Sequence, residues 1–137
     1  MLSILSGCSI PKQQKSLSQH ENMIFTCTPT QLFRCEPKKT SCMTIPIVKT
    51  LGTVQIIVDL AAGNVKSLAN NKVLTESTID SVQFVKQLVY LSGKGIGFDK
   101  TYRSWHAIIN RQDGSLYSSS ITTGAGHVTY GECHEHD

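Results

Sequence analysis

From residue 23 onward, short apolar runs rich in β-branched residues alternate with turn residues. The strongest run, TVQIIVDL at 53–60, stops at Ala-Ala-Gly-Asn, and residues 64–68 return as its hairpin partner. Two further runs, 23–27 and 31–35, are separated by Thr-Pro-Thr, which we expect to divide them into two strands. Runs of this kind, bounded by glycine, proline and asparagine, predict a mainly β chain.

The C-terminal third alternates most clearly. From Trp105, every second residue is apolar, which predicts a strand at 105–110 with one face in the core. The sequence Gln-Asp-Gly at 112–114 supplies the turn, because glycine tolerates the positive φ of a chain reversal. Two further strands are expected at 115–122 and 128–133, on either side of a Gly-Ala-Gly break.

Residues 79–91 are compatible with two structures. Their apolar positions partly fit the spacing of a short helix, whereas the pairs Val82/Phe84 and Val89/Leu91 alternate as in strands. We favour two strands and keep the short helix at 79–91 as the alternative. Sequential hairpins with glycine turns then predict an antiparallel meander, which forms either a small barrel or a two-layer sandwich.

Five cysteines occur, and the first stands apart from an even set of four: Cys27, Cys35, Cys42 and Cys133. In an exported chain four thiols indicate two disulfides, with three possible pairings. Cys27 ends the first expected strand and Cys133 the last, so we favour a bridge between them that closes the meander. Cys35 and Cys42 would then clamp the loop that they enclose.

The tetrapeptide Leu5-Ser6-Gly7-Cys8 resembles the lipobox of bacterial lipoproteins, in which an apolar residue and two small residues precede a cysteine. In that family the thiol is diacylated and the chain is cut just before it, so the resemblance implies lipidation of Cys8. A signal peptide spans roughly 15–30 residues. We therefore interpret residues 1–7 as the remnant of a signal peptide that starts upstream, and a chance tetrapeptide is the alternative.

Residues 8–22 are polar and hold too few apolar side chains to bury a core, which predicts a flexible tether. Residues 23–137 have the length of one ordinary domain, which we expect to be a disulfide-stabilised β domain. Anchor, tether and domain together predict a protein of the bacterial cell envelope that faces the periplasm. Ser9 follows the cysteine, and under the lipoprotein resemblance a serine there is compatible with a destination in the outer membrane.

Composition argues against a nucleic-acid partner and against a membrane-spanning helix. The net charge of +3 is small and the basic residues are scattered, so a nucleic-acid partner is not expected. The longest apolar runs are strand-sized, whereas a membrane-spanning helix needs about 20 apolar residues. The expected contact with a membrane is therefore the lipid anchor alone.

Motifs for catalysis are not found in the chain. It contains no phosphate loop, nucleophile elbow or zinc-protease motif. The glycine-rich stretch 93–97 lacks the helix that would follow a phosphate loop, so we expect a flexible loop there. Cys133 and His134 are adjacent, but a disulfide would occupy that sulfur, and neighbours on a strand point to opposite faces. We therefore expect no enzymatic activity.

One residue cluster has metal-ligand character. At the C-terminus His134 and His136 flank Glu135, and His127 lies nearby in sequence. Imidazole nitrogens bind Cu(II), Ni(II) or Zn(II), so a metal-binding envelope protein is one hypothesis. The alternative is a polar terminus that frays in water. We expect no other cofactor.

Three short features resemble the membrane-bound inhibitors of c-type lysozyme: an aromatic-Thr-Cys opening, a Ser-Gly loop with an aromatic soon after, and a cysteine near the end. In this chain they are Phe25-Thr26-Cys27, Ser92-Gly93 with Phe98, and Cys133. The spacing from Ser-Gly to the aromatic residue differs from that family, and this chain has two further cysteines. The resemblance implies lysozyme inhibition as an alternative function.

The broader hypothesis is a protein-binding, structural or assembly component of the envelope, with a partner that remains unidentified. Tryptophan, tyrosine and arginine anchor many interfaces, and Tyr102, Arg103 and Trp105 occur together. Together with Ser92 and Gly93, they are the candidate partner contacts. For Trp105, burial in the core is the alternative.

Overall fold

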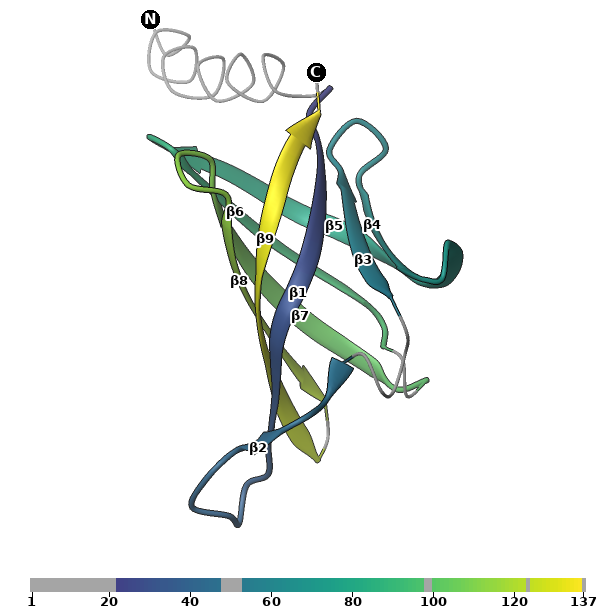
Figure 1. The fold of residues 1–137 in the computed structure, drawn as a ribbon, viewed down its shortest axis with the longest axis vertical. Helices are drawn as coiled ribbons and strands as arrows, with labels where there is room; N and C mark the ends of the chain where they lie inside the picture. The colour runs from purple at the N-terminus through teal and green to yellow at the C-terminus, as the bar shows by residue number, and fades with distance from the viewer. Residues whose placement is uncertain (1–21, 48–52, 98–99, 123, 137) are drawn as a thin grey trace, which may run out of the picture.

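A computed structural model describes residues 22–47, 53–97, 100–122 and 124–136 (Figure 1). The described residues form nine strands: β1 (Ile24–Cys35), β2 (Met43–Thr44), β3 (Val54–Asp59), β4 (Asn64–Ala69), β5 (Lys72–Val85), β6 (Leu88–Ile96), β7 (Tyr102–Asn110), β8 (Ser115–Thr122) and β9 (Ala125–His136). The predicted mainly β class is confirmed. The expected lipidation site Cys8 lies outside the described residues, as does nearly all of the tether at 8–22.

The described strands form a closed antiparallel barrel. Consecutive strands pair from β3 through to β9, and β1 pairs with both β3 and β9, so that eight of the nine described strands complete the wall. Figure 1 shows β1 and β9 side by side at this seam, with the short β2 beside the lower part of β1. Of the two architectures predicted from the meander, the structure is the barrel.

The predicted disulfides are confirmed in the described residues. Cys27 and Cys133 are direct cross-strand partners, joined across the seam of the barrel at a sequence separation of 106. Cys35 and Cys42 close the loop between β1 and β2. The first bridge is buried, whereas Cys42 of the second is exposed.

The expected break at Thr28-Pro29-Thr30 is wrong, because β1 continues through it as one strand. Its register with β9 shifts between Pro29 and Gln31, which marks a β-bulge. Proline has no N–H to donate to the ladder, and a bulge is one of the places where a strand accommodates it.

The alternative helix at 79–91 is also wrong: β5 runs to Val85, and β6 begins at Leu88. Lys86, in the turn between them, has a φ of 56°. A register shift between Ile79 and Ser81 inserts an extra residue into β5. This bulge spaces the half-buried residues Ile79 and Val82 three apart, which imitates a helical period within a strand.

The glycine-rich stretch expected to be a flexible loop is largely strand, since Gly93 and Gly95 lie within β6. A Cβ on Gly93 would come 2.5 Å from Cζ2 of Trp105, its partner on β7. A Cβ on Gly97 would likewise overlap the guanidinium of Arg103. These glycines therefore make room for two large side chains of the neighbouring strand.

The interior of the barrel differs between its two ends. Near the Cys27–Cys133 bridge it is an apolar core of buried side chains: Phe25, Cys27, Val58, Val89, Leu91, Ala107, Ile109, Leu116 and Cys133. Toward the β1–β2 loop, the same inward face also carries polar residues, such as Arg34, Ser120 and His127, beside apolar ones such as Ala125. The alternation predicted from Trp105 places Ala107 and Ile109 in this core, with Trp105 packed against it.

Candidate functional site

Polar side chains from neighbouring strands meet inside the barrel, at the end nearest the β1–β2 loop. Arg103 Nη1 on β7 donates to Ser120 Oγ on β8 at 3.2 Å, and lies 3.3 Å from His127 Nδ1 on β9. Arg103 Nη2 donates to Thr101 Oγ1 at 3.4 Å. A guanidinium has no acceptor, so Nδ1 of His127 accepts this bond and the ring proton lies on Nε2.

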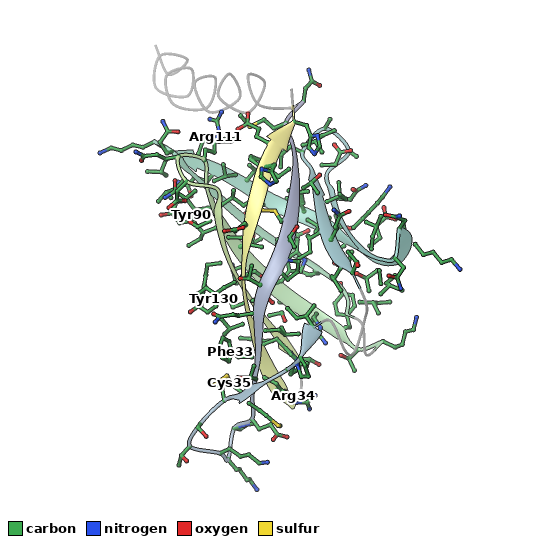
Figure 2. The ribbon with its side chains drawn as sticks, in the orientation of Figure 1. Phe33, Arg34, Cys35, Tyr90, Arg111 and Tyr130 are labelled. Carbon is green, nitrogen blue, oxygen red and sulfur yellow. A yellow bond between two sulfur atoms is a disulfide. The ribbon has the colours of Figure 1, made fainter. Side chains whose placement is uncertain are left out.

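Arg34 on β1 belongs to the same group, because it is the direct cross-strand partner of His127. Cross-strand partners project from the same face of a sheet. His127 in turn pairs with Ser120, and Ser120 with Trp105. We call the five half-buried side chains on this inner face the inner polar cluster: Arg34, Arg103, Trp105, Ser120 and His127. Figure 2 labels Arg34 near the lower end of the molecule, far from Arg111.

Two groups of the inner polar cluster lack partners among the described residues. No hydrogen bond or ion pair joins the guanidinium of Arg34 to another described side chain. Trp105 Nε1 is buried and has no hydrogen-bond partner there. Unused donors of this kind cost free energy unless water or a ligand satisfies them.

The structure divides the five candidate partner contacts between the two faces of the wall. Ser92 and Tyr102 point outward: the hydroxyl of Ser92 lies 2.7 Å from that of Ser81, and Tyr102 is 66% exposed. Gly93, Arg103 and Trp105 face the interior, as their packing shows. The five residues therefore do not share one surface.

The three candidate metal ligands are not brought together either. His127 faces the interior, whereas His134 is seven residues further along β9, about 23 Å away and on the opposite face. His136 is close to His134, and its Nε2 hydrogen-bonds the hydroxyl of Thr26. No group of three metal-ligating side chains occurs among the described residues.

A row of large side chains crosses the outer wall of the barrel. Tyr90 pairs with Ile108, Ile108 with Tyr117 and Tyr117 with Tyr130, each on the next strand. The rings of Tyr117 and Tyr130 lie 5.5 Å apart, and Phe33 meets Tyr130 edge-on at 6.2 Å. The three tyrosines are 37–42% exposed. We call these five residues the tyrosine row, and Figure 2 labels three of them along one side.

A shallow hollow of about 400 Å³ adjoins the tyrosine row on the outer wall. Tyr90 and Ile108 line it together with polar neighbours, among them Ser92 and His106. Sequence reasoning missed the tyrosine row because its members are far apart in the chain. Only the register of five strands places them in contact.

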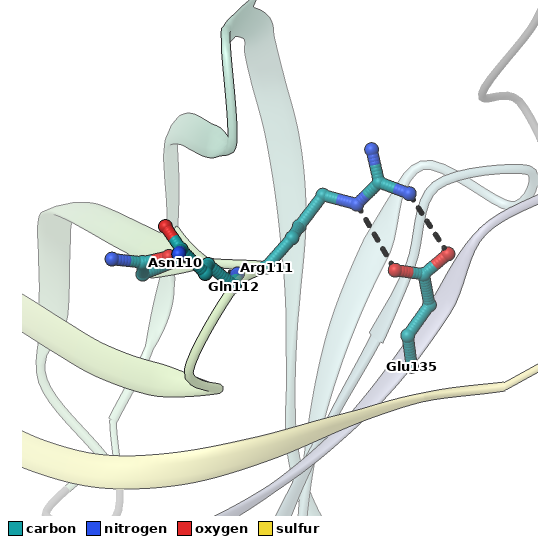
Figure 3. Close-up of polar contacts among 4 residues, drawn as sticks. All are labelled: Asn110, Arg111, Gln112 and Glu135. Atoms are coloured by element: carbon teal, nitrogen blue, oxygen red, sulfur yellow. Dashed lines mark hydrogen bonds and ion pairs between the residues drawn. The ribbon is translucent and has the colours of Figure 1, made fainter.

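An ion pair closes the rim at the apolar end. Arg111, in the turn after β7, donates through Nε to Glu135 Oε1 at 3.0 Å and through Nη2 to Oε2 at 3.2 Å (Figure 3). In the same turn, Asn110 Oδ1 accepts a bond from the backbone N–H of Gln112. The bidentate contact between Arg111 and Glu135 connects the β7–β8 turn to the end of β9.

Comparison with protein-family models, curated proteins and solved structures finds no match for this chain. In the part of the chain that the structure describes, no helix is both long enough and apolar enough to span a membrane.

Proposed function

We propose that this protein is a non-catalytic, protein-binding component of the bacterial cell envelope, anchored to a membrane by lipid on Cys8. The observation that carries the proposal is the tyrosine row. Aromatic side chains, tyrosine especially, are enriched at protein interfaces because they combine a large apolar area with a polar tip. Here four aromatic residues and Ile108 form one contiguous strip across the strands β6 to β9 and β1, beside the hollow that contains Ser92.

Site-specific photo-crosslinking in the native cells tests this proposal. A photoreactive residue replaces Tyr117, at the centre of the tyrosine row, and in a matched variant it replaces Lys66. Lys66 points outward from β4, on the other side of the barrel. We expect a discrete protein adduct from position 117 and none from position 66. The absence of an adduct at 117, or equal adducts at both positions, would reject the tyrosine row as the interface.

The proposed address has its own test. Cys8→Ala should abolish incorporation of labelled fatty acid and leave the chain uncut at this position. A matched Ser9→Ala variant keeps the cysteine and should retain the acyl chain. If the unaltered protein carries no acyl group when its full gene is expressed, the anchor is rejected, whatever the tyrosine row binds.

Lysozyme inhibition is the second candidate, and one observation favours it. The two cysteines of the resemblance, in Phe25-Thr26-Cys27 and at Cys133, are joined by the seam disulfide. The Ser92-Gly93 pair, expected to lie in a loop, lies within β6 instead, and Phe98 is outside the described residues. Inhibition of c-type lysozyme in a cell-wall lysis assay by the purified protein would favour this partner. Undiminished lysis would reject it.

A further inference from the structure

We infer that one rim of the barrel docks onto the surface of a membrane that contains anionic lipids. This rim lies at the end nearest the β1–β2 loop, where the β4–β5, β6–β7 and β8–β9 turns also lie. The contact is additional to the proposed lipid anchor and to the tyrosine row, and depends on neither. On β8, Ile121 of this rim lies four residues from Tyr117 of the tyrosine row, about 13 Å along the strand.

The most exposed large apolar side chains of the described residues gather at this end. Five of them are about half exposed or more, from 49% to 69%. Each lies beside one of the four turns: Met43, Val73, Ile96, Tyr102 and Ile121. Beside the turns at the opposite end, the exposed large apolar side chain among the described residues is Val85, at 42%. A single exposed apolar residue is ordinary, whereas such a concentration marks an interaction surface.

Three of these side chains form a continuous patch on the outer wall. Ile96 and Tyr102 are direct cross-strand partners at the ends of β6 and β7. Ile121 on β8 pairs with Ser104, two residues beyond Tyr102, so it is the diagonal neighbour of the tyrosine. A hollow of about 370 Å³ is lined by Ile121 and by Pro37 of the β1–β2 loop. The apolar surface therefore extends from β6 to that loop.

Lysines stand among these side chains. Lys38 lies in the β1–β2 loop, Lys72 beside the β4–β5 turn and Lys100 in the β6–β7 turn, and all three are exposed. No ion pair joins any of them to another described residue. Among the described residues of the four turns the acid is Glu36, which is paired with Lys39 at 3.2 Å. We call the three lysines and the five apolar side chains the lysine rim.

The mixture of lysines and exposed apolar side chains favours a lipid surface over a protein partner. Lysine is depleted in protein interfaces. At a membrane surface, aliphatic and tyrosine side chains enter the boundary between headgroups and acyl chains, while lysine ammonium groups stay with the lipid phosphates. Each lysine near an anionic surface strengthens binding about fivefold. A set of side chains spread over four turns, rather than gathered in one pocket, also suits an extended surface.

Co-sedimentation with vesicles tests the inference. The full-length Cys8→Ala chain is used, because it cannot be acylated at this position, and failure of the lysine rim is thereby separated from failure of the proposed anchor. We expect binding to vesicles of phosphatidylcholine with phosphatidylglycerol, and binding about tenfold weaker to phosphatidylcholine alone. Added salt should weaken the binding, because it screens the lysines.

Paired variants in this background locate the contact. Tyr102→Ser combined with Ile121→Ser should weaken binding about tenfold, because two apolar side chains no longer leave water. Val85→Ser, at the opposite end, should bind as the parent does. Lys100→Gln should weaken binding about fivefold, whereas Lys86→Gln, likewise at a positive φ but at the opposite end, should not. All five side chains are exposed, so the variants should keep the melting temperature of the parent.

Fluorescence shows directly which end meets the bilayer. In Tyr102→Trp the new indole should be quenched by lipids that are brominated in their acyl chains. In Val85→Trp the new indole should remain unquenched. Trp105 is common to both variants, so the difference between them reports on the introduced residue.

Each other outcome overturns a stated part of the inference. No binding to either kind of vesicle would reject the membrane contact, and a discrete protein adduct from a photoreactive residue at position 102 would then assign the lysine rim to a protein partner. Equal binding to both kinds of vesicle would reject recognition of anionic lipid. Equal effects of the variants at the two ends, or equal quenching at positions 85 and 102, would reject the lysine rim as the surface responsible.

Discussion

The two ends of the barrel interior are built from the same strands, yet they follow different rules. At the end that holds the seam disulfide, inward positions carry valine, leucine, isoleucine and phenylalanine, and the side chains exclude water. At the other end the same strands carry the inner polar cluster, whose members are half-buried. The packed apolar side chains at the first end stabilise the fold. The second retains donors that a purely structural core would lack.

β7 illustrates the contrast within one element. Its inward series begins with Arg103 and Trp105 and ends with Ala107 and Ile109, so polarity changes along a single face. Alternation alone determines which face is inward, and not which end of the barrel a residue occupies. Substitutions in the two halves should therefore have unequal effects on stability. Two comparisons measure this difference, and two further tests examine the glycines of β6 and the β7–β8 turn.

The largest effect is expected at the seam. Replacing Cys27 and Cys133 by alanine should lower the free energy of unfolding by about 4–5 kcal/mol, because this bridge closes a loop of roughly a hundred residues. The matched variant, serine at Cys35 and Cys42, opens a short exposed loop and should cost about 2 kcal/mol. Urea denaturation measures both. Equal losses would contradict a special role for the seam.

A packing comparison comes next. Ile109→Ala removes a side chain that is 1% exposed at the apolar end, and should cost about 3 kcal/mol through lost transfer energy and the cavity left behind. Ser118→Ala, half-buried on the inner face of β8, should stay within about 0.5 kcal/mol. Chemical denaturation of both variants at one pH decides the comparison. A large loss at Ser118 would show that the polar half also stores stability.

The glycines of β6 give a third test. Gly93→Ala forces a Cβ against the Trp105 ring and the Thr78 carbonyl, and should cost about 1–3 kcal/mol. Gly124→Ala, where a Cβ would meet nothing within 4 Å, is the control and should change stability little. The melting temperature and the Trp105 fluorescence should both respond at position 93. A neutral Gly93→Ala would mean that both the indole and the Thr78 backbone can move away.

The smallest effect is expected in the pH dependence of stability, through the β7–β8 turn at the apolar end of the barrel. The Ser115 backbone N–H donates to Asp113 Oδ1 at 2.9 Å, which holds the pKa of this carboxyl below its ordinary value of 3.8. A lowered pKa contributes stability above pH 3.8, and this contribution is lost as the pH falls through the folded-state value. Asp113→Asn should therefore flatten the acid limb of the stability profile slightly. An unchanged acid limb would contradict this.

Much of the fold was predictable because it rests on local rules. β-branched runs, the Gln-Asp-Gly turn and the alternation from Trp105 each depend on neighbours within a few residues. The pairing of Cys27 with Cys133 followed from their places at the ends of the meander. Two of the errors share one cause, since both the continuous β1 and the helix-like spacing near Ile79 come from β-bulges. A bulge depends on what the partner strand requires, and no local pattern contains that requirement.

Sequence alone thus determined the class of structure and favoured the disulfide pairing and several turns that the structure confirms, because these depend on short-range chemistry and on the order of strands along the chain. Only the tertiary structure decided which side chains meet. The tyrosine row and the inner polar cluster each draw on strands distant in sequence, and the register of the closed barrel places them together. Arg34 and His127, which are 93 residues apart in the chain, become neighbours because β1 pairs with β9.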